Sequence, residues 1–342
     1  MARNIPKISF LIPAHNAQDT IERAIKSILE FDCAAEIIVA ENGSTDDTTV
    51  VVKKLIERYK NIVLIHSEQG VSKARNAAIA RSRGAWIAFV DADDSIDAKA
   101  ARKALQDLDV IAADLWVFGH IAGKSRRSVV SSNKIETFEL EDVCECRAKM
   151  LEDPTRYMTV WAKLFKASII KENGLRFNES LTLAEDSDFM LRYTAFCNRI
   201  CFSPEYLYNY SLTASSAVRI YDGKKTKQYI QAMCTTARSI EHEENTLKRA
   251  YEKYVLIHMS IIMVREIFSQ LNQSSFARKV GDMKCVKKVE IFRDAIKHTK
   301  TKECLKVRML PVLFFKYHLD ILSAVLYWIR AKQNARRERR WQ

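Results

Sequence analysis

Long apolar runs and helical repeats alternate over the first 95 residues of the chain. Four runs are almost continuously apolar until they end in polar or turn-forming residues: "KISFLIP", "AEIIVAENGS", "NIVLIHS" and "WIAFVDADD". The stretches between them, at 17–31, 45–59 and 71–83, repeat apolar residues at helical spacing. Continuous apolar runs are typical of strands that are buried on both faces of a sheet. The pattern therefore predicts an α/β fold in which helices cover both faces of a mostly parallel sheet.

Each of the four predicted strands leads into a polar cluster. These clusters are "PAHN", "ENGS", "HSEQG" and "DADD". Binding sites in open α/β sheets lie beyond the carboxyl ends of the strands. A single cluster of this kind is usually a turn or a helix cap, but four of them on one edge predict a functional site.

The later part of the chain is patterned differently. Residues 96–160 are mixed, and the polar stretch 123–134 is expected to form an exposed hairpin or loop. Residues 157–200 favour a helix, a loop and a second helix, and the pattern from residue 223 onward is helical without a clear strand. We therefore predict a first domain at 1–222 and a helical region at 223–342.

The positive charge is concentrated in the last third of the chain. Residues 1–222 contain 29 Lys and Arg against 31 Asp and Glu, whereas residues 223–342 contain 26 against 11. A basic helical region favours an anionic partner, either membrane phospholipid or nucleic acid, over a merely solvated surface. The region has no recognisable nucleic-acid module, and its aromatic residues lie in apolar stretches rather than between basic residues. We expect an anionic membrane surface, and no nucleic acid, as its partner.

The cysteines and the N-terminal sequence favour a cytoplasmic location. The eight cysteines do not form a disulfide framework, and the pairs 144/146 and 197/201 lack a second pair or a His couple at zinc spacing. The first 16 residues contain only a short apolar run, which is typical of a strand rather than of a secretory signal. Both observations predict reduced thiols in a reducing compartment.

The stretch "WIAFVDADDS" ends in three carboxylates, Asp91, Asp93 and Asp94, whose like charges repel one another. Two interpretations are open. Asp94 or Ser95 could cap the next helix by accepting backbone N–H bonds. Alternatively, the aspartates hold a divalent cation, because Mg²⁺ and similar ions take oxygen ligands from one or two carboxylates together with substrate phosphates.

The stretches "SFLIPAHN", "IIVAENGSTDDT", "GVSKARNAAIARSRGAWIAFVDADD" and "LAEDSDF" occur in this order over about residues 7–215. Together they resemble glycosyltransferase family 2, the inverting nucleotide-sugar transferases of GT-A fold. The resemblance implies a GT-A (Rossmann-like) sheet followed by the C-terminal helical region. It makes about 1–95 the nucleotide-sugar half of the first domain and about 96–222 the acceptor half.

The resemblance also assigns residues that bind the donor. They are Pro13, His15, Glu41, Asn42, Arg75 and Asp91. His15 stands where the family has a tyrosine near the nucleotide base, and Glu41 stands where an acidic side chain accepts a hydrogen bond from the base. Arg75 matches an arginine near the base and phosphates, a place that suits a planar guanidinium; a surface salt bridge is the alternative. Asp91 and Asp93 match the ribose and metal carboxylates, and imply Mn²⁺ or Mg²⁺ on the departing diphosphate.

On the acceptor side, the resemblance makes Asp186 the catalytic base within "LAEDSDF". An acceptor hydroxyl needs such a base, and repulsion among the clustered acids can raise one pKa toward the working range. Glu185 belongs to the same motif, and Trp161 and Lys163 match a segment that lines the acceptor side. The alternative for the acids is favourable placement at a helix N-terminus, and Trp161 could equally be a core residue.

These matches predict an inverting transfer of a single sugar from a nucleotide-diphosphate sugar, most simply a UDP-sugar, to a hydroxyl of a glycan or lipid-linked acceptor in surface polysaccharide assembly. Processive members carry a Gln-X-X-Arg-Trp segment that is absent here, which favours single transfer. The chain also departs from its relatives at "YNYSLTASS", where Ser211 follows Tyr210 in place of an arginine. Two other classes stay open: a sugar nucleotidyltransferase, and a non-catalytic basic adaptor that binds an anionic polymer.

The C-terminal stretch 310–329 is long enough to span a bilayer, but Lys316, His318 and Asp320 interrupt it. Lys316, Asp320 and Ser323 would lie on one stripe of a single helix, with apolar residues over the rest and "RAKQNARRERR" adding charge. We expect this helix to lie in the membrane interface, which would make the enzyme peripheral on the inner face of the cytoplasmic membrane. The alternative is a helix that packs on the first domain or forms a homodimer.

Overall fold

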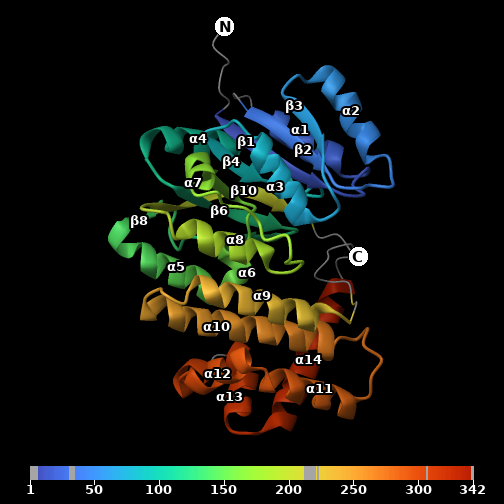
Figure 1. Ribbon diagram of the computed structural model, residues 1–342, viewed down its shortest axis with the longest axis vertical. Coiled ribbons are helices and arrows are strands. Elements are labelled where there is room, and N and C mark those ends of the chain that lie inside the picture. Colours follow the sequence, from blue (N-terminus) through green and yellow to red (C-terminus); the bar gives the residue numbers. More distant parts are fainter. Residues whose placement is uncertain (1–6, 31–34, 212–220, 222, 306, 340–342) are drawn as a thin grey trace. The chain divides into compact units, whose positions relative to one another are not determined.

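The computed structural model describes residues 7–30, 35–211, 221, 223–305 and 307–339 (Figure 1). The chain forms two compact units. Unit 1 consists of Met1–Met150 and Pro154–Leu212, and unit 2 consists of Leu151–Asp153 and Thr213–Gln342. The boundary expected at residue 222 lies outside the described residues.

Unit 1 is built on a single ten-stranded sheet, in which the strands follow the order β3-β2-β1-β4-β9-β6-β10-β5, with β7 paired to β6 and β8 paired to β10. The strands are β1 (Ile8–Ala14), β2 (Ala35–Glu41), β3 (Ile62–His66), β4 (Trp86–Phe89), β5 (Ser95–Ile96), β6 (Leu115–Ala122), β7 (Ser125–Arg127), β8 (Glu136–Phe138), β9 (Lys163–Lys166) and β10 (Ile200–Tyr210). Strands β1 to β4 are mutually parallel, and β6 is parallel to β10. Because β9 is antiparallel to both β4 and β6, these two sets of strands point the same way.

Helices cover both faces of this sheet, as Figure 1 shows. They are α1 (Ile21–Leu29), α2 (Thr48–Arg58), α3 (Val71–Arg81), α4 (Ala98–Val110), α5 (Val143–Glu152), α6 (Pro154–Tyr157), α7 (Ala167–Glu172) and α8 (Glu185–Thr194), with a 3₁₀ turn at Leu140–Asp142. The four strands and three helices predicted for the first 95 residues all form. The predicted mostly parallel α/β fold is therefore confirmed.

The region after residue 96 contains strands that the sequence pattern did not reveal. The stretch 157–200, expected as two helices and a loop, also supplies β9, which fills the middle of the sheet. This strand is only four residues long and begins and ends with lysine, so its pattern gives no strand signal. The expectation of a hairpin or loop at 123–134 is confirmed, since β7 folds back on β6, although Val129 and Val130 are buried.

An aromatic cluster fixes α8 against the end of β4. Phe89 at the end of β4 meets Phe165, Phe177 and Phe189 edge to face, with ring centroids 5.3–6.0 Å apart. The rings of Phe177 and Phe189 stack with centroids 4.2 Å apart. Such ring pairs contribute about 0.5–1.5 kcal/mol each beyond their buried area. The cluster therefore holds the first turn of α8 close to the carboxyl end of β4.

Unit 2 is helical throughout its described residues, as predicted. It contains α9 (Lys225–Ser239), α10 (Asn245–Ile262) with a π-helical continuation at Met263–Ile267, α11 (Phe276–Lys288), α12 (Glu290–His298), 3₁₀ turns at Thr301–Leu305 and Val307–Met309, α13 (Leu310–Lys316) and α14 (Asp320–Arg339). Its core includes Tyr254, Met259, Phe268 and Tyr327.

The single helix expected at 310–329 is wrong. The chain turns between α13 and α14, where His318 has φ 59°. The three polar residues expected on one stripe have separate structural tasks instead. Lys316 Nζ donates to the Lys297 carbonyl at 3.2 Å, Asp320 pairs with Lys287 at 2.6 Å, and Ser323 Oγ donates to the Pro311 carbonyl at 2.7 Å.

Candidate active site

The carboxyl ends of six strands lie on the same edge of the sheet, because β1, β2, β3, β4, β6 and β10 all point the same way. We call this edge the rim. The polar or aromatic side chains within two residues of these strand ends include His15, Glu41, His66, Asp91, His120 and Tyr208. The sequence predicted that polar clusters after the first four strands meet at one edge, and β6 and β10 add side chains to the same edge.

Glu41 is an ionised acceptor that already has two partners. Its Oε2 lies 2.9 Å from Nδ1 of His66, and its Oε1 accepts the backbone N–H of Ser44. Burial acts to raise the pKa of Glu41, but the hydrogen bonds from Ser44 and His66 outweigh it, and the pKa lies below its ordinary value. Glu41 therefore carries a fixed negative charge at the end of β2.

Three other residues that the sequence predicted to bind the donor lie near Glu41. Pro13 is buried within β1, and Asn42 is buried while its backbone N–H donates to the Ala14 carbonyl at 3.0 Å. His15 is exposed, and its ring approaches only the Asn16 amide, at 3.5 Å. The structure places all three beside Glu41, where His15 is the side chain most open to solvent.

Arg75 of α3 joins the end of β4 to the start of α8. Its Nη1 donates to Oδ1 of Asp186 at 2.7 Å and to Oε1 of Glu185 at 3.1 Å, and its Nη2 lies 3.3 Å from Oδ1 of Asp91. The Arg75 side chain is only 4% exposed. Burial opposes its charge, but Asp186, Asp91 and Glu185 together raise its pKa above the ordinary value. The surface salt bridge considered for Arg75 is therefore wrong.

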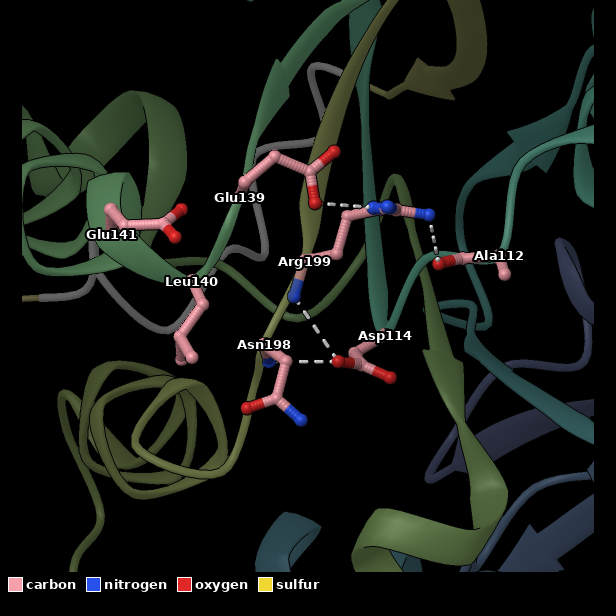
Figure 2. Close-up of a pocket in the computed structure, with 7 residues that line it drawn as sticks. All are labelled: Ala112, Asp114, Glu139, Leu140, Glu141, Asn198 and Arg199. Atoms are coloured by element: carbon pink, nitrogen blue, oxygen red, sulfur yellow. Dashed lines mark hydrogen bonds and ion pairs between the residues drawn. The ribbon is translucent and has the colours of Figure 1, made fainter.

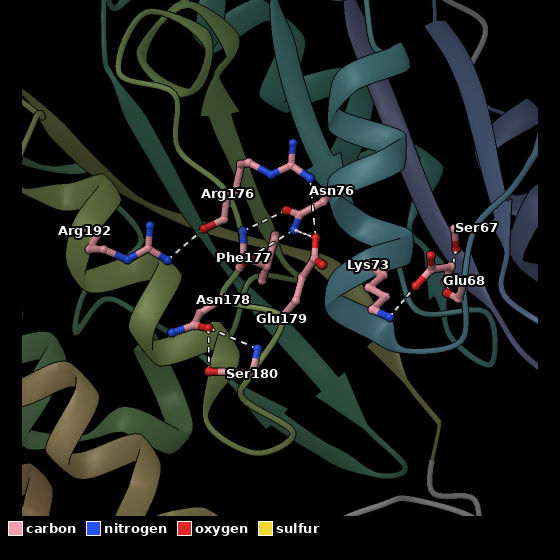
Figure 3. A network of polar contacts seen from close by, with 10 residues as sticks. All are labelled: Ser67, Glu68, Lys73, Asn76, Arg176, Phe177, Asn178, Glu179, Ser180 and Arg192. Atoms are coloured by element: carbon pink, nitrogen blue, oxygen red, sulfur yellow. Dashed lines mark hydrogen bonds and ion pairs between the residues drawn. The ribbon is translucent and has the colours of Figure 1, made fainter.

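The next residue of α3, Asn76, secures the loop that leads to α8 (Figure 3). Its side-chain amide donates to the Phe177 carbonyl at 3.0 Å and to Glu179 at 2.8 Å, and its carbonyl oxygen accepts the Phe177 N–H at 2.8 Å. Adjacent residues of one helix thus hold both the acids at the start of α8 and the loop before them.

The aspartates after β4 do not cap the next helix. That task belongs to Asp97, whose carboxylate accepts the Ala100 N–H at 2.8 Å. Asp94 is 1% exposed, and it accepts the Ser211 N–H at 2.6 Å. Burial and the charge of Asp91 raise the pKa of Asp94 to about 8. The helix-cap interpretation of Asp94 and Ser95 is therefore wrong.

Asp91 and Asp93 lie at the rim. The Asp91 side chain is 32% exposed, its backbone N–H donates to the Tyr208 hydroxyl at 3.0 Å, and Asp93 is half-buried. Burial and the charges of Asp186 and Asp93 raise the pKa of Asp91 to about 6, against the opposing effect of Arg75. Among the described residues, no three His, Cys, Asp or Glu side chains converge as a complete metal site. Two hard carboxylates are nevertheless the usual protein share of a site that phosphates and water complete, so the residues fit Mn²⁺ or Mg²⁺.

The acids of α8 divide into one structural residue and two rim residues. Asp188 is 2% exposed and forms an ion pair with Arg192. Asp186 accepts from Arg75 through Oδ1 and from the Val160 N–H, 3.2 Å away, through Oδ2. Burial, then the charge of Asp186, raises the pKa of Glu185 to about 7, with Arg75 opposing. All three lie in the first turn, but their partners show that the helix dipole alone does not account for Glu185 and Asp186.

Trp161 and Lys163 lie beside these acids at the start of β9. The Trp161 ring stacks on Tyr208 and Tyr210, with centroids 4.9 and 5.6 Å apart, and meets His120 edge-on at 4.7 Å. Lys163 is 2% exposed, and its Nζ reaches only Thr159 Oγ1 and the Trp161 carbonyl, both at 3.4 Å. Burial lowers the pKa of Lys163 to about 7, and the negative charge of Asp186 opposes this shift.

Three residues of the rim were not nominated from the sequence: His66, His120 and Tyr208. His66 belongs to a polar cluster that the sequence did single out, so a search for partners of Glu41 could have found it. His120 and Tyr208 lie on β6 and β10, two strands that the pattern did not predict.

The hollow drawn in Figure 2 is not part of this site. It has a volume of about 550 Å³ and is lined by Ala112, Asp114, Glu139, Leu140, Glu141, Asn198 and Arg199. Ala112 and Asp114 precede β6, and Asn198 and Arg199 precede β10, at the amino ends of these strands, while residues 139–141 follow β8, which is antiparallel to β10. Asp114 there accepts the backbone N–H of Asn198 at 2.8 Å and of Arg199 at 3.2 Å, so its carboxylate serves the loop. The rim lies at the opposite edge of the sheet.

Comparison with known proteins assigns the class. Residues 9–172 match the family model for glycosyl transferase family 2. The chain is 26% identical to the succinoglycan biosynthesis protein ExoO of Rhizobium meliloti over 63% of this chain and 64% of that protein, and 24% identical to the putative glycosyltransferase EpsH of Bacillus subtilis over 92% of each. Residues 9–172 therefore belong to glycosyltransferase family 2, as the motifs in this stretch predicted.

A solved structure confirms the fold. The structure of residues 1–349 of TarS from Staphylococcus aureus superposes with a TM-score of 0.66 at 20% identity, over 96% of this chain and 92% of that one. TarS is a poly(ribitol-phosphate) beta-N-acetylglucosaminyltransferase, and a structure of the same fragment contains UDP-GlcNAc. The sequence alignment with TarS spans 60% of this chain and 35% of that protein at 26% identity. In the part of our chain that the structure describes, no helix is long and apolar enough to cross a bilayer.

Proposed function

We propose that the chain is an inverting glycosyltransferase that moves one sugar from a nucleotide-diphosphate sugar, with UDP as the nucleotide, to a hydroxyl of a surface-glycan acceptor. One observation carries the proposal: a single buried guanidinium, Arg75, contacts both Asp91 at the donor strands and Asp186 at the start of α8. A donor carboxylate and a base are thus held in one cluster, as a displacement at a sugar carbon requires. The complex of TarS with UDP-GlcNAc supports the choice of nucleotide.

In the proposed reaction Asp186 is the base. Arg75 and the Val160 N–H hold its two oxygens, and each oxygen retains a lone pair for a third partner. The acceptor O–H gives its proton to Asp186 while its oxygen forms a bond to the anomeric carbon. The bond from that carbon to the diphosphate breaks, so the configuration inverts and the nucleoside diphosphate leaves.

Asp91 and Asp93 would hold Mn²⁺ or Mg²⁺ beside the diphosphate. Such an ion supplies positive charge where the leaving group becomes negative. The exposed edge of Asp91 and the raised pKa of both Asp91 and Asp94 support this placement, because like charges at one strand end favour a shared cation.

A panel of nucleotide sugars tests the proposal. Each sugar nucleotide is added with Mn²⁺, and thermal stabilisation and slow donor hydrolysis are measured. UDP-sugars should raise the melting temperature and release UDP, whereas GDP- and CMP-sugars should do neither. Release of pyrophosphate would instead support a sugar nucleotidyltransferase, and binding of nucleic acid with a steep salt dependence would support the basic adaptor.

Unit 2 supports a second proposal, peripheral attachment to the anionic inner face of the cytoplasmic membrane. One face of α14 packs into unit 2 through Ala324, Tyr327 and Ala331. The opposite face carries an exposed apolar row, which we call the α14 stripe: Ile321, Leu322, Val325 and Ile329, each 36–56% exposed. The 26 Lys and Arg against 11 Asp and Glu in residues 223–342 complement anionic lipid better than a second copy of the same basic unit.

A further inference from the structure

A group of three basic side chains that form no ion pair with a described carboxylate lies on the acceptor side of the rim. Arg127 of β7 is exposed, Arg156 of α6 is half-buried, and Lys163 of β9 is buried. Among the described residues, none of the three forms an ion pair with a carboxylate, whereas Arg75 has three carboxylate partners. Unpaired cations held close together repel one another, so the group is stabilised when an anion binds.

Strand pairing brings this group to the rim. His120 at the end of β6 lies directly opposite Arg127 of β7, so the two side chains stand on the same face of the sheet. The His120 ring contacts Trp161, and Trp161 is stacked on Tyr208. His120 and Trp161 thus connect Arg127 to Tyr208, the tyrosine that accepts the Asp91 backbone N–H.

Two further features fix the hairpin that carries Arg127. Arg156 Nε donates to the carbonyl of Ser128, the residue after Arg127, at 2.7 Å. Gly119 of β6 allows the hairpin to lie close, because a Cβ at that position would stand 2.9 Å from the Arg127 carbonyl. Burial lowers the pKa of His120 to about 4, and the charges of Lys163, Arg127 and Arg156 contribute. All three cations therefore act on one place beside Trp161.

The position of the group separates it from the donor. In the sheet, β1, β2 and β3 with Glu41 and His66 lie on one side of β4, and β9 and β6 lie on the other. Resting on the proposed function, we propose that Arg127, Arg156 and Lys163 form a phosphate-binding subsite for the acceptor. Arg127 and Arg156 would contact the phosphate oxygens, which suit guanidinium groups, and Lys163 would add charge from within the sheet. The transferred sugar would then go to a hydroxyl of a phosphate-bearing molecule.

The phosphate could come from a lipid-linked sugar diphosphate or from a polyol-phosphate polymer. Three probes separate these sources: an alkyl diphosphate-linked N-acetylglucosamine, an oligo(ribitol phosphate), and the same alkyl N-acetylglucosaminide without phosphate. Calorimetry with the full chain, saturated with UDP so that the donor site is filled, measures each dissociation constant. At least one phosphorylated probe should bind about tenfold more tightly than the neutral one, a difference that salt reduces.

Variants locate the effect. Arg127→Gln should weaken the phosphorylated probe about tenfold relative to the neutral probe, and Arg127→Lys should restore much of the loss. The matched control is Arg126→Gln, because Arg126 is the adjacent residue of β7 and its guanidinium lies over the Tyr206 ring, 5.4 Å from the ring centroid. It should leave the ratio unchanged.

Equal binding of phosphorylated and neutral probes, or equal effects of the Arg126 and Arg127 variants, would overturn the subsite. Failure of the proposed function looks different, because then no UDP-sugar would bind or hydrolyse in the donor panel. The phosphate probes would still report on the subsite in that case, since their binding is measured without transfer. Preference for the diphosphate lipid or for the ribitol phosphate identifies which source of phosphate the enzyme uses.

Discussion

The two units of the chain use charge in opposite ways. Unit 1 is almost neutral in composition, yet it buries Arg75, Asp94 and Lys163 at one edge of its sheet. Unit 2 carries the excess of positive charge, and its α14 leaves apolar side chains in solvent. The strongest electrostatic perturbations in this molecule thus lie in the unit with the smaller net charge. Net charge indicates what a surface attracts, whereas catalysis depends on where individual charges are buried.

The largest expected effect is at Asp186. We predict that Asp186→Asn lowers the transfer rate by a factor of about 10²–10⁴, the usual contribution of a general base, while UDP affinity changes little. Steady-state kinetics and calorimetry measure the two quantities. Asp188→Asn is the matched control in the same helical turn, because Asp188 pairs with Arg192 rather than with the rim. Turnover like that of the wild type would transfer the role of base to Glu185.

Removing Arg75 tests how far unit 1 depends on its buried charge. Arg75→Met leaves three acids without their shared cation and should destabilise unit 1 by roughly 3 kcal/mol in urea unfolding, without changing unit 2. The loss should be smaller at pH 5 than at pH 8. The pKa of Glu185 is raised from 4.5 to about 7, so the folded unit loses stability as the pH rises between these two values, and this loss grows without Arg75. Lys26→Met, at an exposed ion pair with Glu22, should cost far less stability, because solvent screens that pair.

Unit 2 has its own buried titratable group, His258. Burial lowers the pKa of His258 to about 4, so the unfolded chain binds a proton more readily between pH 6.5 and 4. Unit 2 should therefore lose roughly 3 kcal/mol over this window as the pH falls. His258→Leu should remove that part of the pH dependence, as measured by urea unfolding at several pH values. His298→Leu, at an exposed histidine paired with Glu252, should leave it in place.

The metal proposal predicts a smaller effect on binding. Asp93→Ala should weaken UDP about tenfold in the presence of Mn²⁺, and chelation should weaken the wild type to a similar extent. Calorimetry with and without EDTA measures both. Asp109→Ala, at an exposed aspartate paired with Lys7, is the control. If UDP binds the wild type equally well after chelation, Asp91 and Asp93 act without a metal.

The α14 stripe gives the smallest expected effect. Replacing Ile321, Val325 and Ile329 with serine should lower flotation with phosphatidylglycerol vesicles about tenfold at low salt, with an unchanged melting temperature. The control replaces Val110 and Leu140, two exposed apolar residues of unit 1, with serine. Equal flotation of both variants would exclude the stripe as the membrane contact. Loss of a concentration-dependent dimer in the stripe variant would instead assign the stripe to a second copy.

The sequence predicted the parts of unit 1 in which periodicity and motif coincide. Every strand and helix of the first 95 residues was found, because each strand there is a long apolar run bounded by turn residues. The later strands were missed for physical reasons. β9 is short and flanked by lysines, and β10 contains Pro204 and several polar residues, so tertiary pairing rather than local pattern defines them.

The candidate site was likewise predicted only in part from the sequence. Arg75 and Asp186 were named from their motifs, but their direct contact was not, because it joins α3 to α8 across the rim. The error at 310–329 had a similar origin. The apolar stretch was long enough for one helix. The structure instead has two helices with a turn at His318, and Lys316 and Asp320 contact different partners.

The place of β9 between β4 and β6 also bears on how the chain folds during synthesis. The ribosome completes β1 to β4 long before it delivers Lys163–Lys166, so the edge of β4 has no neighbour during that interval. An apolar strand with an unpaired edge readily pairs with another chain. The nascent segment from β1 to β4 is therefore most prone to aggregation before β9 has been synthesised. Pairing of β9 with β4 then covers the open edge. Fragments that end near residue 95 should accordingly depend on chaperones, whereas chains that extend past β9 should not.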